Sequence, residues 1–211
     1  MAHVLEVGSD PDAAIDAAVS AISEGKCIVL PTDTVYGIAA SAFDADAVQR
    51  LLNAKQRGRD MPPPVLIGDV LALPTLADEV TEQIRAVADS FWPGALTIIV
   101  RAQASLDVDL GDRGSTIAVR IPDHDFTRAL LRATGPLAVS SANVSGRPAA
   151  LSIAEAVDQL QHSVAVFLDG GPASGPVPST IVDLSGQPRL LREGRISVTD
   201  LREVLPELAE G

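Results

Sequence analysis

The chain has 211 residues, of which 46% are hydrophobic, and this length and composition suit one domain with a substantial core. Its formal net charge is -12, with 16 Lys and Arg against 28 Asp and Glu, which disfavours extended binding to nucleic acid or to an anionic membrane. The single cysteine, Cys27, excludes an intrachain disulfide, and the three scattered histidines lack the spacing of a zinc site.

Targeting signals are not evident in the sequence. The first residues, MAHVLEVGSD, have no basic start followed by an apolar run, so we expect no signal peptide. No stretch approaches about 18 continuous apolar residues, so we expect no membrane span. The default expectation is a soluble cytoplasmic protein.

Hydrophobic periodicity predicts that helices and strands are intermixed from the start of the chain. We expect a helix at 9–25, strands at 26–30 and 36–42, a helix at 44–56, an extended segment at 62–68 and a helix at 77–91. Asp10 can cap the first helix, Pro11 suits its first position and Gly25 can end it. Three prolines keep 62–68 extended, because proline cannot continue a helix.

The second half of the chain continues this mixed pattern. We expect strands at 95–102, 115–122, 136–143, 164–171, 179–185 and 187–194, and helices at 125–134, 152–161 and 197–208. Ser152 and Glu155 have the spacing of a capping box. The order does not alternate strictly, so an α/β fold with a mixed sheet is favoured over a plain Rossmann sheet. The Pro- and Gly-rich segment 170–178 is the best candidate for a mobile loop or lid.

Polar clusters follow apolar strands at four places, and strand ends are common ligand sites in α/β proteins. The first cluster is PTDTVYG. Strand alternation would place Thr32, Thr34 and Tyr36 on one face and Asp33 and Val35 on the other. These hydroxyl groups could line a site, although an ordinary half-buried strand would also explain them.

The second cluster is AKQRGR, which places three cations within five residues of an acidic chain. Lys55, Arg57 and Arg59 could hold phosphates or a carboxylate through charge-assisted hydrogen bonds. The alternative is a solvated basic turn that opposes the dipole of the preceding helix.

The third cluster is VSSANVSGRP. Short side chains at Ser140, Ser141, Asn143 and Ser145, with free backbone N–H groups and a turn at Gly146, would make a phosphate cradle. The stretch is not a P-loop, because the GxxxxGK[ST] pattern is missing. A plain Ser- and Asn-rich loop is the alternative.

The fourth cluster is dispersed over three strands: Thr116 and Arg120, Ser179 and Thr180, and Arg192. An arginine inside an apolar strand is costly unless it meets an internal carboxylate or an anionic ligand, and the sequence leaves both possibilities open. No Ser-His-Asp arrangement is evident, and no spacing singles out a pair of catalytic carboxylates.

Six motifs, in this order, resemble the YrdC-like family of threonylcarbamoyl-AMP synthases: PTDTVYGI, AKQR, STIAVRIP, SSANVSGRP, PSTIVDL and LLREG. The resemblance covers about residues 15–200, and six motifs in the family order make it specific. It implies one domain over 1–211 with its core at about 12–200, in the short, single-domain form. The implied fold is α/β, with a twisted, mixed and mostly parallel sheet and flanking helices around a deep cationic cavity.

The resemblance also implies a nucleotidyltransferase activity. Members of the family form threonylcarbamoyl-AMP and pyrophosphate from L-threonine, bicarbonate and ATP, and the product serves the N6-threonylcarbamoyladenosine modification of tRNA. Separate transfer proteins act downstream, so weak or no direct tRNA binding is expected. Mg²⁺ is the expected cofactor, held mostly by the phosphate oxygens of ATP, and no protein ligand for it is assigned.

Site residues follow from the same resemblance. It implies catalytic roles for Lys55 and Arg57 beside the triphosphate. Contacts to threonine are implied for Thr34, Tyr36, Arg120, Ser179 and Thr180. Contacts to ATP are implied for Lys55, Arg57, Thr116, Ser141, Asn143 and Arg192. Leu66 falls where the family often has a histidine, so any contact made by that histidine is absent or replaced.

Two rival functions are kept. A non-catalytic RNA-binding module would bind tRNA in a salt-sensitive way without ATP turnover, although the few cations and the few aromatic residues weigh against it. A related carbamoyl-adenylate-forming enzyme would use carbamoyl phosphate, and an assay without threonine separates it from the synthase.

Overall fold

The computed structural model describes residues 3–112 and 114–210, so the predicted domain limits of 1–211 include residues 1, 2, 113 and 211 outside the described part. The strands are β1 His3–Glu6, β2 Ile28–Leu30, β3 Gly37–Ser41, β4 Val65–Leu66, β5 Leu96–Arg101, β6 Thr116–Arg120, β7 Leu137–Ser141, β8 Val166–Asp169, β9 Thr180–Asp183, β10 Arg189–Arg192 and β11 Ala209–Glu210. The helices are α1 Pro11–Ser23, α2 Ala45–Ala54, α3 Leu73–Leu76, α4 Glu82–Phe91, α5 Asp125–Thr134, α6 Ile153–Leu160 and α7 Val198–Val204, with short 3-10 turns η1 Val70–Ala72 and η2 Gln161–Ser163.

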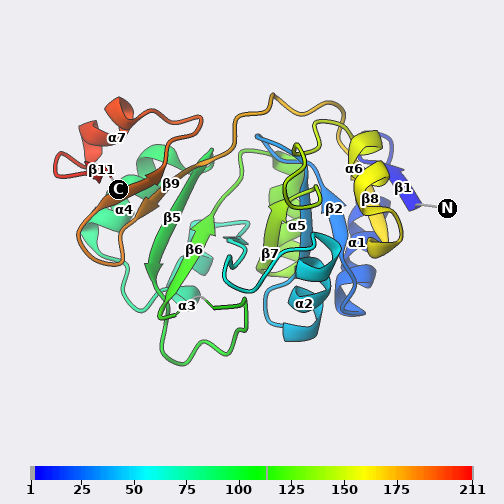
Figure 1. Ribbon diagram of the computed structural model, residues 1–211, viewed down its shortest axis with the longest axis horizontal. Helices are drawn as coiled ribbons and strands as arrows, with labels where there is room; N and C mark the ends of the chain where they lie inside the picture. Colours follow the sequence, from blue (N-terminus) through cyan, green and yellow to red (C-terminus); the bar gives the residue numbers. More distant parts are fainter. Residues whose placement is uncertain (1–2, 113, 211) are drawn as a thin grey trace.

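These strands form one open sheet in the order β1-β8-β2-β3-β7-β4-β6-β5-β9-β10-β11. Parallel pairing joins β1 to β8, β8 to β2, β4 to β6, β5 to β9 and β10 to β11, and the other neighbours are antiparallel. The mixed α/β sheet predicted from the sequence is therefore confirmed. Figure 1 shows β5, β6 and β9 in the left half of the molecule and β2, β7 and β8 in the right half.

Local capping explains where several helices begin. Asp10 caps α1, and its carboxylate accepts a hydrogen bond from the Ala13 N–H at 3.0 Å, as predicted. Helix α4 begins five residues later than expected, with Thr81 as its cap. The reason is that Ala77 pairs with Ala102 in a β-bridge and cannot also start a helix.

The capping box predicted at Ser152 and Glu155 is only half formed. The Ser152 hydroxyl accepts from the Glu155 N–H at 3.3 Å, but the Glu155 carboxylate accepts from Leu151 N–H rather than from Ser152. A reciprocal box occurs instead at Ser197 and Asp200, at the start of α7. The sequence did not predict β11 and α3, because elements of two to four residues are too short to show a hydrophobic period.

Two apolar clusters show which helices cover which face of the sheet. On one face, α1 and α5 pack on the right half through residues such as Ala18, Leu130 and Leu168. On the other face, α2, α3, α4, α6 and α7 cover both halves, and Leu52 and Val87 belong to that cluster. Over β5, β6 and β9 the first face borders a cavity instead of a helix. This difference between the two halves places the candidate site.

The segment after β8 joins the two halves. Residues 170–178, which the sequence marks as a possible lid, cross the top of the molecule in Figure 1 on the way to β9. Ala173 N–H donates to the Leu151 carbonyl at 2.8 Å, which ties this segment to the right half. In the described part of the chain, no helix has the length and apolar character needed to cross a membrane.

Candidate functional site

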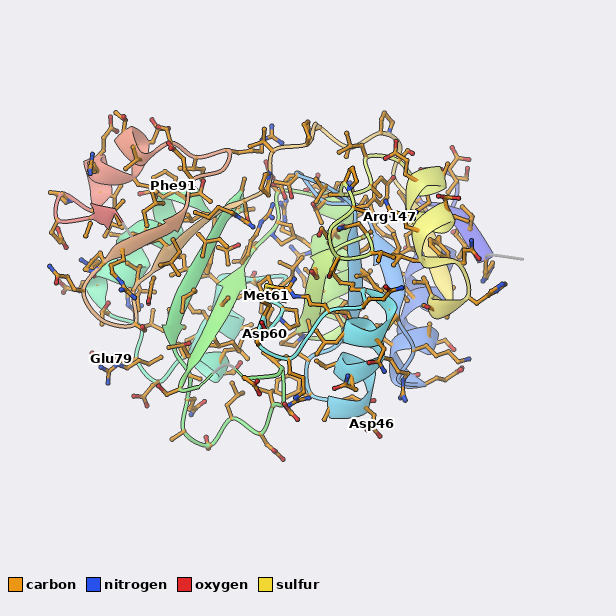
Figure 2. All side chains as sticks on the ribbon, in the orientation of Figure 1. Asp46, Asp60, Met61, Glu79, Phe91 and Arg147 are labelled. Atoms are coloured by element: carbon orange, nitrogen blue, oxygen red, sulfur yellow. The ribbon has the colours of Figure 1, made fainter. Side chains whose placement is uncertain are left out.

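A cavity of about 720 Å³ lies on the sheet face that α1 and α5 leave uncovered. Strands β3, β7, β4, β6, β5, β9 and β10 or their adjoining loops all contribute to its wall. The described lining residues include no Asp or Glu and four arginines: Arg57, Arg120, Arg147 and Arg192. Two residues of the wall are labelled in Figure 2, with Met61 near the middle of the view and Arg147 beside α6.

The PTDTVYG stretch is a tight turn, not a strand, so the predicted alternation is wrong. The Thr32 hydroxyl donates to the Val35 carbonyl at 2.7 Å and accepts from the Thr34 N–H at 3.1 Å, which folds the chain back locally. As a result, Asp33 and Thr34 both reach Arg120 rather than pointing apart. Side-chain hydrogen bonds replace the strand ladder here.

Tyr36 lines the cavity but directs its hydroxyl elsewhere. The phenol donates to the Gly171 carbonyl at 2.5 Å and accepts from the Gly170 N–H at 3.1 Å. Burial raises the pKa of Tyr36 to about 12. Its hydroxyl therefore holds the start of segment 170–178.

Arg120 meets an internal carboxylate, one of the two possibilities that the sequence left open. Its Nη2 lies 2.6 Å from Asp33 Oδ1, its Nη1 3.2 Å from Thr34 Oγ1 and its Nε 2.9 Å from the Gly94 carbonyl. Burial lowers the pKa of Arg120, and the Asp33 carboxylate opposes that shift. A guanidinium has five N–H donors, so two remain for a ligand in the cavity.

Lys55 lies behind the cavity wall rather than in it. Its ammonium donates to the carbonyls of Ser141 and Asn143, the latter at 2.8 Å, and to Asn143 Oδ1 at 3.4 Å. Burial lowers the pKa of Lys55 to about 8, and the charge of Arg57 adds to the effect. The structure brings Lys55 to the predicted phosphate loop, where its hydrogen bonds hold the backbone of residues 141–143 in place.

Arg57 and Arg59 have different surroundings, although they are two residues apart. Arg57 lines the cavity and donates to Ser140 Oγ at 3.1 Å, while its buried Nε has no hydrogen-bond partner among the described residues. Burial lowers the pKa of Arg57. Arg59 instead pairs with Asp109, and both side chains are more than 40% exposed. The solvated alternative therefore holds for Arg59, but not for Arg57.

The phosphate cradle predicted for the Ser- and Asn-rich loop lacks most of its free backbone donors. The N–H groups of Ala142, Asn143 and Ser145 donate to backbone carbonyls, and that of Val144 donates to the Gln159 side chain. Each bond occupies an amide that would otherwise be free for an anion. Ser140, Ser141 and Asn143 do line the cavity, so this loop offers side chains rather than a nest of amides.

The fourth cluster is only partly brought together. Thr116, Ser179 and Arg192 line the cavity with Arg120, whereas Thr180 is fully buried away from it. Arg192 donates through Nε and Nη2 to the Ser179 carbonyl at 3.1 and 2.8 Å. Partial desolvation and the neighbouring charge of Arg57 lower the pKa of Arg192. The two arginines therefore repel each other across the site.

Thr180 uses its hydroxyl within the fold. The oxygen accepts from the N–H groups of Gly194 and Ile196 at 2.9 and 3.0 Å and donates to the Ile196 carbonyl at 2.6 Å. Position 180 has its side chain on the opposite face of β9 from the cavity residue Ile181, because strand side chains alternate. The contact between Thr180 and threonine that the family resemblance implies thus has no support in this geometry.

Replacing Thr180 by valine is expected to lower the free energy of unfolding by about 1–3 kcal/mol, because the partly buried amides of Gly194 and Ile196 lose their acceptor. Urea denaturation measures this change, with Thr75→Val at an exposed position as the control. The affinity for L-threonine should stay within a few-fold of the wild-type value. A large loss of affinity with unchanged stability would instead support the substrate contact.

Two polar residues among the described lining residues have no role predicted from the sequence. Thr97, on β5, and Arg147, after the SSAN motif, both contribute to the wall. The sequence signal for Thr97 is its position between Leu96 and Ile98, opposite in phase to the buried apolar residues of the strand. It passes for an ordinary β-branched residue until the uncovered face of the sheet is known.

The chain is similar in sequence to a family model and to named proteins. Residues 20–194 match the family model of Sua5, YciO and YrdC, which is described as "Telomere recombination". A protein of Mycobacterium tuberculosis, provisionally named threonylcarbamoyl-AMP synthase, is 48% identical over 192 residues, covering 90% of this chain and 88% of its own. The threonylcarbamoyl-AMP synthase of Bacillus subtilis is 35% identical over 200 residues, covering 93% of this chain and 58% of its own.

Two solved structures share the fold. Sua5 of Pyrococcus abyssi, complexed with L-threonine, superposes with a TM-score of 0.93 at 31% identity, over 100% of this chain and 62% of that one. YciO of Escherichia coli superposes with a TM-score of 0.81 at 26% identity, over 95% of this chain and 98% of that one. The chain therefore spans less than two thirds of the Bacillus and Pyrococcus proteins, but nearly all of YciO.

Proposed function

The chain belongs to the Sua5/YciO/YrdC family, and on that premise we propose that it is a threonylcarbamoyl-AMP synthase. It would convert L-threonine, bicarbonate and ATP into threonylcarbamoyl-AMP, pyrophosphate and water, and the adenylate would serve tRNA modification through separate transfer proteins. The main support is the wall of the 720 Å³ cavity, where Arg57, Arg120 and Arg192 stand among hydroxyl groups, with no carboxylate among the described lining residues.

Arg120 suits the carboxylate of the amino acid. Its two remaining N–H donors can bind two carboxylate oxygens, and charge-assisted bonds of this kind are about twice as strong as neutral ones. Asp33, Thr34 and Gly94 hold the guanidinium in place before a ligand arrives. Such preorganisation lowers the entropy that binding costs.

The opposite part of the wall suits the phosphates of ATP. Arg57 has an unpartnered buried Nε and repels Arg192, so an anion between them would satisfy the first and relieve the second. Ser140, Ser141 and Asn143 add polar groups beside Arg57. Positive groups at this place stabilise the charge that develops on phosphate oxygens during phosphoryl chemistry.

The proposed reaction has two bond-forming steps. The threonine amine and bicarbonate give a carbamate with loss of water, and a carbamate oxygen then attacks the α-phosphorus while pyrophosphate leaves. Holding the amino acid and the nucleotide in one cavity makes the attack effectively unimolecular. Exclusion of water would protect both the carbamate and the adenylate, and Pro176 and Pro178 of segment 170–178 form part of the wall.

Mg²⁺ is proposed as part of the MgATP substrate. The described residues lining the cavity include no carboxylate, and hydroxyl and amide oxygens alone are poor ligands for a resident Mg²⁺. We therefore derive no step from a metal held by the protein. The charge of the arginines would complement the phosphate oxygens that the metal leaves free.

The deciding experiment is an assay of pyrophosphate release from ATP with threonine, bicarbonate and Mg²⁺ omitted one at a time. The proposal expects activity only when all are present. Activity without threonine but with carbamoyl phosphate would point to the related carbamoyl-adenylate enzyme. Salt-sensitive tRNA binding without turnover would point to the RNA-binding module.

A further inference from the structure

Thr97 lies on β5 in the wall of the cavity. Its side chain is 2% exposed, and its Oγ1 lies 2.9 Å from the Oγ of Ser179, the residue directly before the neighbouring strand β9. In the antiparallel register of β5 and β6, Ile98 pairs with Val119, so the next pair places Thr97 opposite Arg120. Directly opposed residues have Cβ atoms about 5 Å apart on the same face. Thr97 therefore lies between Arg120 and Ser179.

The Thr34 hydroxyl also contacts Arg120, but its proton is already donated within the turn. The Thr32 hydroxyl gives its proton to the Val35 carbonyl, so the 3.0 Å contact between the two hydroxyls is donated by Thr34. Thr34 Oγ1 also accepts from Arg120. It can meet a ligand only as an acceptor, for example of an amine or hydroxyl proton.

The hydroxyls of Thr97 and Ser179 differ from Thr34, because together they keep both a donor and an acceptor. One of their two protons joins the pair, and the other stays free whichever residue donates. Among the described residues, the one further contact is Arg192 Nη2, 3.3 Å from Ser179 Oγ. At least one lone pair therefore also remains. A free donor beside a free acceptor complements a ligand hydroxyl, which needs both.

We propose that Thr97, paired with Ser179, binds the side-chain hydroxyl of the amino acid whose carboxylate lies on Arg120. Thr97 is then a specificity-determining residue that selects a β-hydroxy amino acid over an apolar analogue of the same shape. An analogue without the hydroxyl would leave the pair unsatisfied in a desolvated site, which is an effective way to reject it. This inference rests on the proposed function.

The test compares L-threonine with L-valine, in which a methyl group replaces the hydroxyl, in the pyrophosphate-release assay. Thr97→Val is expected to lower kcat/KM for L-threonine by about 10- to 100-fold and to leave the value for L-valine unchanged or higher. Thr97→Ser, which keeps the hydroxyl, should retain the wild-type preference within a few-fold. Calorimetric Kd values for the two amino acids should shift in the same way without turnover.

The outcomes are distinct. If wild type turns over with threonine but Thr97→Val keeps the same threonine-to-valine ratio, the inference is overturned and the proposed function stands. If wild type neither binds nor uses threonine, the proposed function itself is overturned. Ser179→Ala provides a second measurement should Thr97→Val fail to fold, and an unchanged ratio in that variant also overturns the inference.

Discussion

Replacing Arg57 by alanine is expected to lower threonine-dependent pyrophosphate release by about 100-fold or more, while the folded state becomes no less stable. The activity should fall because the proposed contact between Arg57 and the transferring phosphate is lost, and single preorganised donors of this kind contribute about 100- to 1000-fold. Stability is kept because burial of Arg57 is unfavourable, as its lowered pKa and unpartnered Nε indicate. Steady-state kinetics with ATP and thermal unfolding measure the two quantities.

Arg59→Ala is the matched control, since it removes a guanidinium from the same loop but from an exposed pair with Asp109. Its activity should stay near that of wild type. Lys55→Ala should also lose about 100-fold in activity, because residues 141–143 lose their support and a misplacement of about 1 Å can cost that much. This variant should be less stable as well, because the carbonyls of Ser141 and Asn143 lose their donor. Wild-type rates in both Arg57→Ala and Lys55→Ala would refute their predicted roles.

Replacing Asp33 by alanine should lower the free energy of unfolding by about 3–5 kcal/mol, the usual result of leaving one charge of a buried pair without its partner. The pair with Arg120 is short and enclosed, with side chains 15% and 8% exposed. Asp33 also accepts from the Asp123 N–H at 3.1 Å, so its loss also removes a bond to the loop between β6 and α5. Urea unfolding monitored by circular dichroism measures the change.

Two further variants serve as controls, one at Asp33 itself and one in an exposed ion pair. Asp33→Asn keeps an acceptor and should cost less than Asp33→Ala. Glu24→Ala removes a carboxylate from the exposed pair with Lys26, where both side chains are more than half exposed, and should cost far less than Asp33→Ala because solvent screens the pair. An equal effect in Asp33→Ala and Glu24→Ala would mean that the pair with Arg120 is screened by solvent and does not order the site.

Expectations based on neighbouring residues were confirmed more often than those that needed a distant partner. The cap at Asp10 and the helix predicted at 44–56, which is α2 at Ala45–Ala54, depend on residues within a few positions, so local sequence patterns find them. The alternation across PTDTVYG is wrong because the Thr32 hydroxyl folds the turn back. The predicted cradle lacks most of its free amides because the Gln159 side chain of α6 and backbone carbonyls such as those of Tyr36 and Lys55 occupy them.

The sequence by itself determined the class of the fold, the cationic and hydroxyl-bearing motifs and their order, because these depend on composition and short-range pattern. Only the tertiary structure decided which polar groups share the cavity. It placed Thr97 opposite Arg120 and Lys55 behind the wall, and it directed Thr180 to the 194–196 backbone. The physical reason is that strand order and helix coverage bring together residues from 14 to 88 positions apart, and hydrogen bonds then fix where each side chain points.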